Sequence, residues 1–239
     1  MLVNNKICVF DFETDGKDPR VCSPVQLAAL MVDPIKLEIV PKSEFNITIK
    51  PEKLENDAKY TYKNSEDGDI LAWHGKVRGC SEDDVLASWQ EATPQKQAWT
   101  MFINYLDLHH SRTQKKSKFS APIASGFNII RFDLKITDRL STKYGNVSKE
   151  GESEIFAPRD TIDIMNMLYP WMMNIEEVKS ISLDSLRKFF GIPVEGGHDA
   201  LKDVKDCADI LIRFLKLHKT LSEKIRFKDA FKSPIKVCS

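Results

Sequence analysis

Residues 7–16 read ICVFDFETDG, and this stretch decides the fold. Ile7, Val9 and the interleaved phenylalanines predict an interior strand, because β-branched and aromatic side chains suit a buried, pleated surface. Side chains alternate along a strand, so Asp11 and Glu13 would point to the same face, two residues apart. Neighbouring carboxylates repel each other and are unfavourable to bury without a partner. The strand contains no Lys or Arg, so a divalent cation, which prefers carboxylate oxygens, is the candidate partner. The open alternative is a strand end where both carboxylates reach water.

The composition is that of a soluble globular protein. The chain has 239 residues, of which 42% are hydrophobic and 29% charged, which is ordinary for such proteins. Lysine plus arginine equals aspartate plus glutamate at 35 each, so the net charge does not indicate a nucleic-acid binder. Any site for a polyanion would therefore have to be local.

The cysteines indicate a reducing compartment. They are odd in number and scattered, with no C-x-x-C pair, at Cys8, Cys22, Cys80, Cys207 and Cys238. This pattern argues against a disulfide framework and against a zinc site. There is no signal-peptide pattern and no apolar run of membrane-spanning length. We therefore expect a cytoplasmic protein.

Three strand-like segments come first, followed by alternating strand and helix. The predicted strands are 6–13, 25–32, 44–50 and 122–127, and the predicted helices are 81–108, 129–140, 160–171, 183–190 and 200–217. Asp15 and Gly16 mark a turn, and the polar stretch 54–79 has no clear period and is interpreted as a surface insertion. This order predicts a mixed sheet with helices packed on it, in a single domain over residues 1–220 with a C-terminal tail at 221–239.

Further candidate ligands lie in two later segments. SGFNIIRFDLKI (125–136) places Asp133 in a helix, and GGHDALKDVKDCADIL (196–211) places His198 in a glycine-rich loop and Asp203 in the first turn of a long helix that Asp199 would cap. Each has an ordinary interpretation alone: a solvated carboxylate, a loop histidine, and an acid at the positive end of a helix. The ordered set D-x-E, N-x-x-x-x-D and H-x-A-x-x-D is what favours a metal site.

The order and context of these motifs resemble the DEDDh 3′→5′ exonucleases, the group of proofreading polymerase subunits and bacterial exonuclease I. FDFETDG with SPVQLAAL resembles the first motif, GFNIIRFD the second and GHDALKDVKDCADI the third, and the resemblance covers about residues 6–217. DTIDIMNMLYP and LDSLRKFFGIP match the connecting pattern, and the Trp73-His74-Gly75 stretch resembles an Ile-His-Gly stretch of the family. Phe127 departs from the histidine that many members carry. The resemblance implies a ribonuclease H-like α/β/α sandwich around a five-stranded mixed sheet.

The resemblance also implies roles for individual residues. Two Mg²⁺ or Mn²⁺ ions would be held by four carboxylates: Asp11 as the bridging ligand, Glu13 and Asp203 at the nucleophile side, and Asp133 at the second ion. His198 would be the general base, since the intrinsic pKa of histidine suits proton removal near neutral pH. Substrate contacts would come from Phe12, Thr14 and Asn128.

The implied function is 3′→5′ hydrolysis of single-stranded DNA to nucleoside 5′-monophosphates. Two alternatives stay open: an exoribonuclease of the same fold, since the motifs do not separate DNA from RNA, and a non-catalytic nucleic-acid-binding module. The expected partners are single-stranded DNA 3′ ends, RNA in the alternative, and a protein of replication or repair. The basic loop 111–120 is interpreted as solvated or as a phosphate contact.

Overall fold

The computed structural model describes residues 5–57, 59–60, 62, 68–112, 114, 116–173, 175–176 and 180–225. The predicted C-terminal tail therefore lies largely outside the described residues, and so does part of the 54–79 insertion. In the described part of the chain, no helix is both long and apolar enough to cross a membrane.

A mixed sheet of six strands forms the centre of the molecule. β1 (Ile7–Thr14) pairs antiparallel with β2 (Pro24–Asp33), and β2 also pairs with β3 (Glu38–Ile39) and β4 (Phe45–Thr48). On the other side of β1, the parallel strands β5 (Ile123–Gly126) and β6 (Ile162–Asp163) complete the order β3-β2-β1-β5-β6. The predicted α/β fold class is confirmed, and the sheet has one strand more than expected because β3 and β4 occupy successive parts of the same edge of β2.

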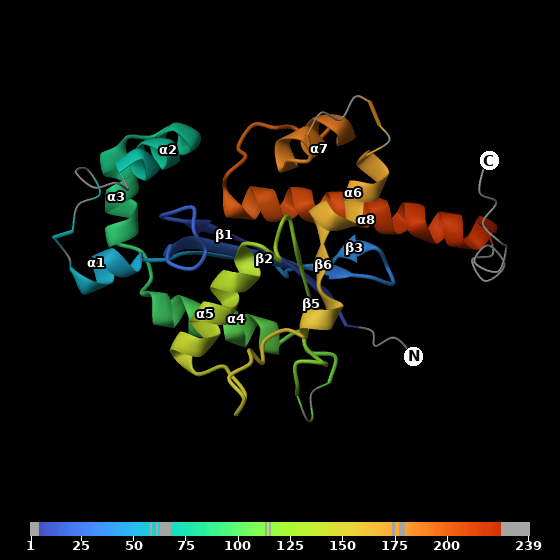
Figure 1. Ribbon diagram of the computed structural model, residues 1–239, viewed down its shortest axis with the longest axis horizontal. Helices are drawn as coiled ribbons and strands as arrows, with labels where there is room; N and C mark the ends of the chain where they lie inside the picture. Colours follow the sequence, from blue (N-terminus) through green and yellow to red (C-terminus); the bar gives the residue numbers. More distant parts are fainter. Residues whose placement is uncertain are drawn as a thin grey trace, which may run out of the picture.

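Helices cover both faces of this sheet (Figure 1). On one face lie α4 (Gln95–Asp107) and α5 (Asp133–Tyr144), and on the other lie α6 (Ile164–Met172), α7 (Leu183–Phe190) and α8 (Ala200–Ile225). The alternation along β1 follows this division: Phe10 and Phe12 pack toward α4 and α5, whereas Ile7 and Val9 pack toward α6–α8. By the same alternation, Asp11 and Glu13 face the α8 side.

A helical arm lies beside this sandwich (Figure 1). It consists of α1 (Glu52–Asn56), α2 (Gly68–Arg78) and α3 (Glu82–Gln90), and its small core brings Leu71, Val85 and Trp89 together with Val25 of β2. The prediction of an aperiodic surface insertion at 54–79 is wrong for its second half. The inward side of α2 includes a histidine and a glycine (His74 and Gly75), so the sequence shows no apolar stripe.

Other predicted boundaries also shift for local reasons. The predicted helix 81–108 is two helices because Pro94 precedes Gln95 and starts a new one. The first of them begins with a capping box between Ser81 and Asp84. The helix predicted from residue 160 begins at Ile164, because Ile162–Asp163 form β6 and the Asp163 side chain caps the helix. α7 has the predicted bounds.

One glycine brings β5 close to β1. A side chain on Gly126 would place its Cβ 2.7 Å from the carbonyl oxygen of Phe10, so a larger residue would push the two strands apart. This close approach helps to bring Asp133, which follows β5, next to β1.

Candidate active site

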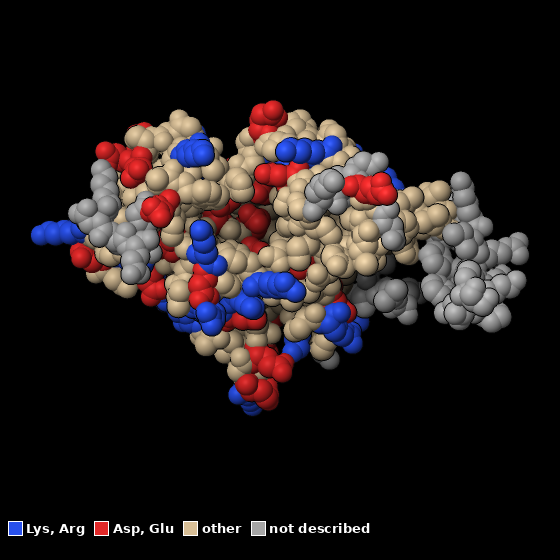
Figure 2. Space-filling model, turned by 45° about the horizontal axis from the view of Figure 1, so that its top comes forward, with Lys and Arg blue, Asp and Glu red and all other residues tan. Residues whose placement is uncertain are grey.

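Three carboxylates from two elements converge on one point. Asp11 and Glu13 on β1 and Asp203 in the first turn of α8 each offer an oxygen within 4.8 Å of the others. Figure 2 shows a hollow floored by acidic side chains, between the part of the molecule that carries α2 and α3 and the part that carries α7. Glu13 and Asp203 are each 8% exposed, so their carboxylates lie at the bottom of this hollow.

The start of α8 is fixed by its cap. The Asp199 side chain accepts a hydrogen bond from the backbone N–H of Lys202 (3.1 Å), and the Asp203 N–H donates to the carbonyl oxygen of Asp199 (2.9 Å). The predicted N-cap is therefore confirmed. The second Asp199 oxygen accepts from Gln26 Nε2 (3.1 Å), which ties the first turn of α8 to β2 and so to the neighbouring β1.

Burial and mutual repulsion make it unfavourable for the carboxyl groups of this cluster to be charged without a counter-ion. Burial, then repulsion from Asp133, Glu13 and Asp203, raises the pKa of Asp11 well above its usual range. Burial and the nearby Asp203 raise the pKa of Glu13 to about 8. Burial also raises the pKa of Asp203, although the Arg187 guanidinium opposes this. A divalent cation bound between these oxygens would remove the repulsion, so the donor set fits a hard cation.

The fourth predicted ligand lies next to this group. Asp133 is the first residue of α5 and is 3% exposed. Its Oδ1 accepts a hydrogen bond from the backbone N–H of Phe12 (2.9 Å), which places the carboxyl against β1 between the two acidic positions. Burial raises its pKa to about 7 in spite of that hydrogen bond. Asp133 does not belong to the group within 4.8 Å, and its effect on the pKa of Asp11 shows that it lies nearby.

A buried arginine supports the cluster from behind. The Arg187 side chain is 1% exposed and donates to Asp203 Oδ1 (2.5 Å), Asp206 Oδ2 (2.7 Å) and Asp184 Oδ1 (2.7 Å). No role was predicted for Arg187 from the sequence, and its partner Asp206 is buried as well. The available signal was that Leu183, Leu186 and Arg187 occupy positions i, i+3 and i+4, which puts Arg187 on the apolar side of α7.

His198 lies in the loop between α7 and α8, at the rim of the cluster. Its φ is +65°, a left-handed conformation that is unfavourable for a residue with a side chain, and its N–H donates to Asp203 Oδ1 (3.2 Å). Gly196 has a φ of +76°, and a Cβ on Gly197 would lie 2.9 Å from Arg187 Nη1. The two glycines therefore allow the loop to turn closely over Arg187.

The three residues that were predicted to contact the substrate lie in three different environments. The Phe12 side chain is 4% exposed and packs in the core on the opposite face of the sheet from Asp11, so its ring has little surface to offer a ligand. Thr14 lies at the end of β1, where the pairing with β2 becomes irregular, and its carbonyl oxygen accepts from His74 Nε2 (2.9 Å). Asn128 has a φ of +56°, and its buried Oδ1 has no hydrogen-bond partner among the described residues.

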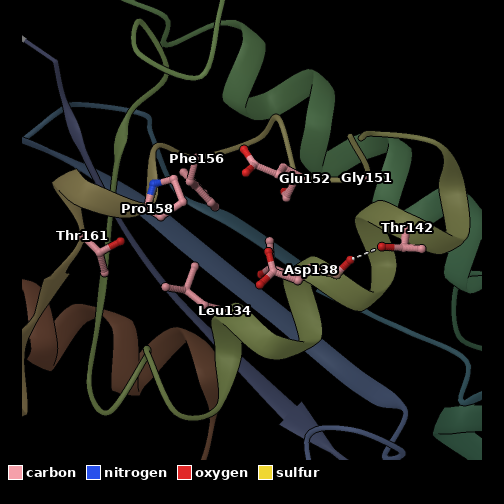
Figure 3. A pocket seen from close by; sticks show the side chains of 10 residues that line it. Leu134, Asp138, Thr142, Gly151, Glu152, Phe156, Pro158 and Thr161 are labelled. Carbon is pink, nitrogen blue, oxygen red and sulfur yellow. Dashed lines mark hydrogen bonds between the residues drawn. The ribbon is translucent and has the colours of Figure 1, made fainter. Parts of the chain in front are cut away.

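A separate cavity of about 390 Å³ lies on α5 (Figure 3). Its lining includes Leu134, Asp138, Thr142, Glu152 and Phe156, and the Thr142 hydroxyl donates to the carbonyl oxygen of Asp138 (3.0 Å). Across the described residues, the convergent metal-ligating oxygens belong to the β1–α8 cluster and not to this cavity. The acidic hollow is therefore the candidate active site.

The fold and this arrangement define an α/β protein with a ribonuclease H-like fold, whose structural neighbours include exonucleases. The sequence matches no protein-family model and no curated protein sequence. Exonuclease I from Methylocaldum szegediense is similar with a TM-score of 0.58 and 19% identity, over 92% of this chain and 40% of that one. The zinc-bound form of the E. coli ExoI–ssDNA complex gives a TM-score of 0.58 and 18% identity, over 96% of this chain and 43% of that one.

A third neighbour is cell-death related nuclease 4 (CRN-4), with a TM-score of 0.59 and 15% identity, over 90% of this chain and 65% of that one. This chain thus spans about two-fifths of the length of the exonuclease I chains and about two-thirds of CRN-4. At these identities the similarity establishes the shared fold.

Proposed function

We propose that the protein is a metal-dependent 3′→5′ exonuclease that hydrolyses single-stranded DNA to nucleoside 5′-monophosphates. The observation that carries this proposal is the convergence of Asp11, Glu13 and Asp203 within 4.8 Å in an acidic hollow. The first two could have reached water at a strand end. Instead they face a third carboxylate, which comes from the other end of the chain. Three carboxylates this close together are typical of a site that binds cations.

Asp11, Glu13, Asp203 and Asp133 would hold two Mg²⁺ or Mn²⁺ ions, with Asp11 shared between the sites. When bound, such ions supply charge stabilisation at the phosphate and at the leaving oxygen of a phosphodiester. Arg187 keeps Asp203 oriented through its 2.5 Å contact. The hydrogen bond from the Phe12 N–H orients Asp133 in the same way. These buried contacts give the carboxylates the fixed geometry that catalysis needs.

His198 would take the proton from the attacking water. It is exposed at the rim of the cluster, and the chain passes from it through Asp199 directly into α8. The backbone of Thr14 and the side chain of Asn128, whose Oδ1 lacks a partner in the described part of the chain, would contact the terminal nucleotide. DNA as the substrate is supported by a neighbour that is an ExoI–ssDNA complex.

A labelled-strand assay tests the proposal. Single-stranded DNA and RNA of the same sequence, each labelled at the 5′ end, are incubated with the protein in Mg²⁺, Mn²⁺ or EDTA. We expect stepwise shortening of the DNA from its 3′ end with either metal, release of nucleoside 5′-monophosphates, and no reaction in EDTA. Asp11→Asn should be inactive, and Asp209→Asn on the half-exposed side of α8 should be fully active.

The same assay separates the alternatives. Preferred shortening of the RNA would make the protein an exoribonuclease, and tight binding of both strands without cleavage would make it a binding module. Nicks in circular single-stranded DNA, or full activity in EDTA, would contradict the proposal.

A further inference from the structure

An exposed tryptophan on the helical arm contacts the proposed general base. The ring centroids of Trp73 and His198 lie 5.0 Å apart with their planes at 67°, an edge-to-face arrangement. Trp73 belongs to α2 and is 42% exposed, and His198 belongs to the loop before α8. Two segments far apart in the sequence therefore meet at the mouth of the acidic hollow.

The position of Trp73 is fixed by its neighbour in the sequence. His74 is fully buried, and its Nε2 lies 2.9 Å from the carbonyl oxygen of Thr14, the residue after Glu13. A carbonyl oxygen accepts, so Nε2 carries the hydrogen and donates it. His74 also packs edge-to-face on Trp89 at 5.2 Å. This contact ties α2 to the end of β1, and Trp73 is thereby held at a set distance from the acidic residues of that strand.

His198 has few other contacts to orient its ring. Its backbone is left-handed and it follows two glycines, and the hydrogen bond from its N–H to Asp203 holds the backbone and not the imidazole. Within the described part of the chain the imidazole has no hydrogen-bond partner. A general base has to point at the water that it deprotonates, so this ring needs another source of orientation.

We propose that Trp73 is a positioning residue whose indole orients the His198 imidazole toward the acidic cluster. The inference rests on the proposed function, in which His198 is the base. Trp73 acts through His198 and makes no contact with the reacting atoms. The arm formed by α1–α3 then has a role in the reaction: it carries the aromatic ring against which the catalytic loop packs.

Two substitutions of Trp73 and one matched control test this role. Trp73→Ala should lower kcat about 10- to 100-fold, the usual result of a misplaced catalytic group, with unchanged KM and Mn²⁺ affinity. Trp73→Phe should restore most of kcat because a phenyl ring can pack in the same edge-to-face manner. Trp171→Ala is the control: Trp171 is 45% exposed and packs edge-to-face on Phe214, but it lies on α6. The Trp171→Ala variant should have the kcat, KM and Mn²⁺ affinity of the wild type.

A double-mutant cycle and an NMR measurement make the test independent of folding. If Trp73 acts through His198, then Trp73→Ala should cause no further loss in a His198→Gln background. The imidazole resonances of His198, identified by their loss in His198→Gln, should move in Trp73→Ala as the ring-current effect disappears, and Trp171→Ala should leave them in place.

Additive losses in the cycle, or an unmoved His198 resonance, would overturn the inference. A raised KM with unchanged kcat would also overturn it, and would make Trp73 a platform for a substrate base. The failure of the proposed function looks different: the wild type would show no cleavage of DNA or RNA with Mn²⁺, while the ring-current shift stays intact.

Discussion

At the scale of single residues, Asp11 is the position where stability and function conflict most. Its carboxyl is surrounded by three others, and burial and their repulsion raise its pKa well above the usual range. Asp11→Asn keeps the shape and removes the charge. We expect the metal-free variant to melt at a higher temperature than the metal-free wild type, and to lose the stabilisation by Mn²⁺ together with activity. Thermal melts in EDTA and in Mn²⁺ measure both effects. A variant that Mn²⁺ still stabilises would show that the ligand assignment is wrong.

His198 tests the chemistry separately from metal binding. In the proposed mechanism it contacts the attacking water and no metal, so His198→Gln should reduce single-turnover cleavage by about 10²–10⁴-fold. Mn²⁺ affinity by calorimetry and DNA affinity by anisotropy should change little. Undiminished cleavage would make His198 an ordinary loop residue, and weakened Mn²⁺ binding would make it a ligand.

At the scale of secondary-structure elements, Arg187 joins α7 to α8 beneath the site. Its side chain is 1% exposed and pairs with Asp203 and Asp206 on α8. Arg187→Met would remove the counter-charge of Asp203 and leave Asp206 with Lys202 as its counter-charge. Breaking a buried ion pair in this way typically lowers the free energy of unfolding by about 3–5 kcal/mol. Lys205, also on α8, forms an exposed ion pair with Glu44, which precedes β4. Lys205→Met should change the free energy of unfolding by about 0–1 kcal/mol.

Urea denaturation of the two variants decides this point. Equal, small losses would mean that the Arg187 pairs contribute no more than a surface ion pair does. A large loss that shrinks when the pH is lowered would identify the unpaired carboxylates as its cause, because protonation removes their charge.

The elements that the sequence predicted are those with a clean local signal. β1 and β2 are short apolar runs, α7 has a clear helical period, and the Asp199 cap marks the start of α8. The D-x-E motif and Asp203 could therefore be placed on their elements. α2 was missed because its inward residues, such as His74, are buried for a tertiary reason, the contact with Thr14. Arg187 was missed because its two buried partners, Asp203 and Asp206, lie on another helix. Pairings of this kind leave no periodic trace in the sequence.

At the scale of the whole molecule, the charge distribution bears on how a strand is held. The net charge is zero, and the described lysines of the basic loop form ion pairs: Lys116 with Asp107 and Lys118 with Glu152. Long-range attraction for DNA is therefore weak. We expect these 239 residues to digest long strands distributively, and binding to weaken as salt rises. Excess unlabelled DNA added after binding tests this. Complete digestion of each labelled strand before release would contradict it.

The stability of the whole fold should depend on pH in opposite ways with and without metal. The pKa values of about 8 for Glu13 and about 7 for Asp133 exceed the ordinary values of 4.5 and 3.8, so the metal-free folded state binds more protons than the unfolded state. The contribution of these groups is present in full below about pH 4 and is lost as the pH rises toward 8. His74 acts in the other direction: burial lowers its pKa from 6.5 to about 4, so its contribution is lost as the pH falls through that window.

More carboxyl groups have a raised pKa than histidines have a lowered one in this comparison. We therefore expect the melting temperature in EDTA to fall between pH 5 and pH 8. With Mn²⁺ it should rise over the same range, since protons and the cation compete for the same oxygens. Calorimetric melts at each pH, in EDTA and in Mn²⁺, measure both slopes, and Asp11→Asn should flatten the difference between them. If the melting temperature changes with pH in the same way with and without Mn²⁺, these carboxylates do not bind the ion together. That result would contradict the proposed metal site.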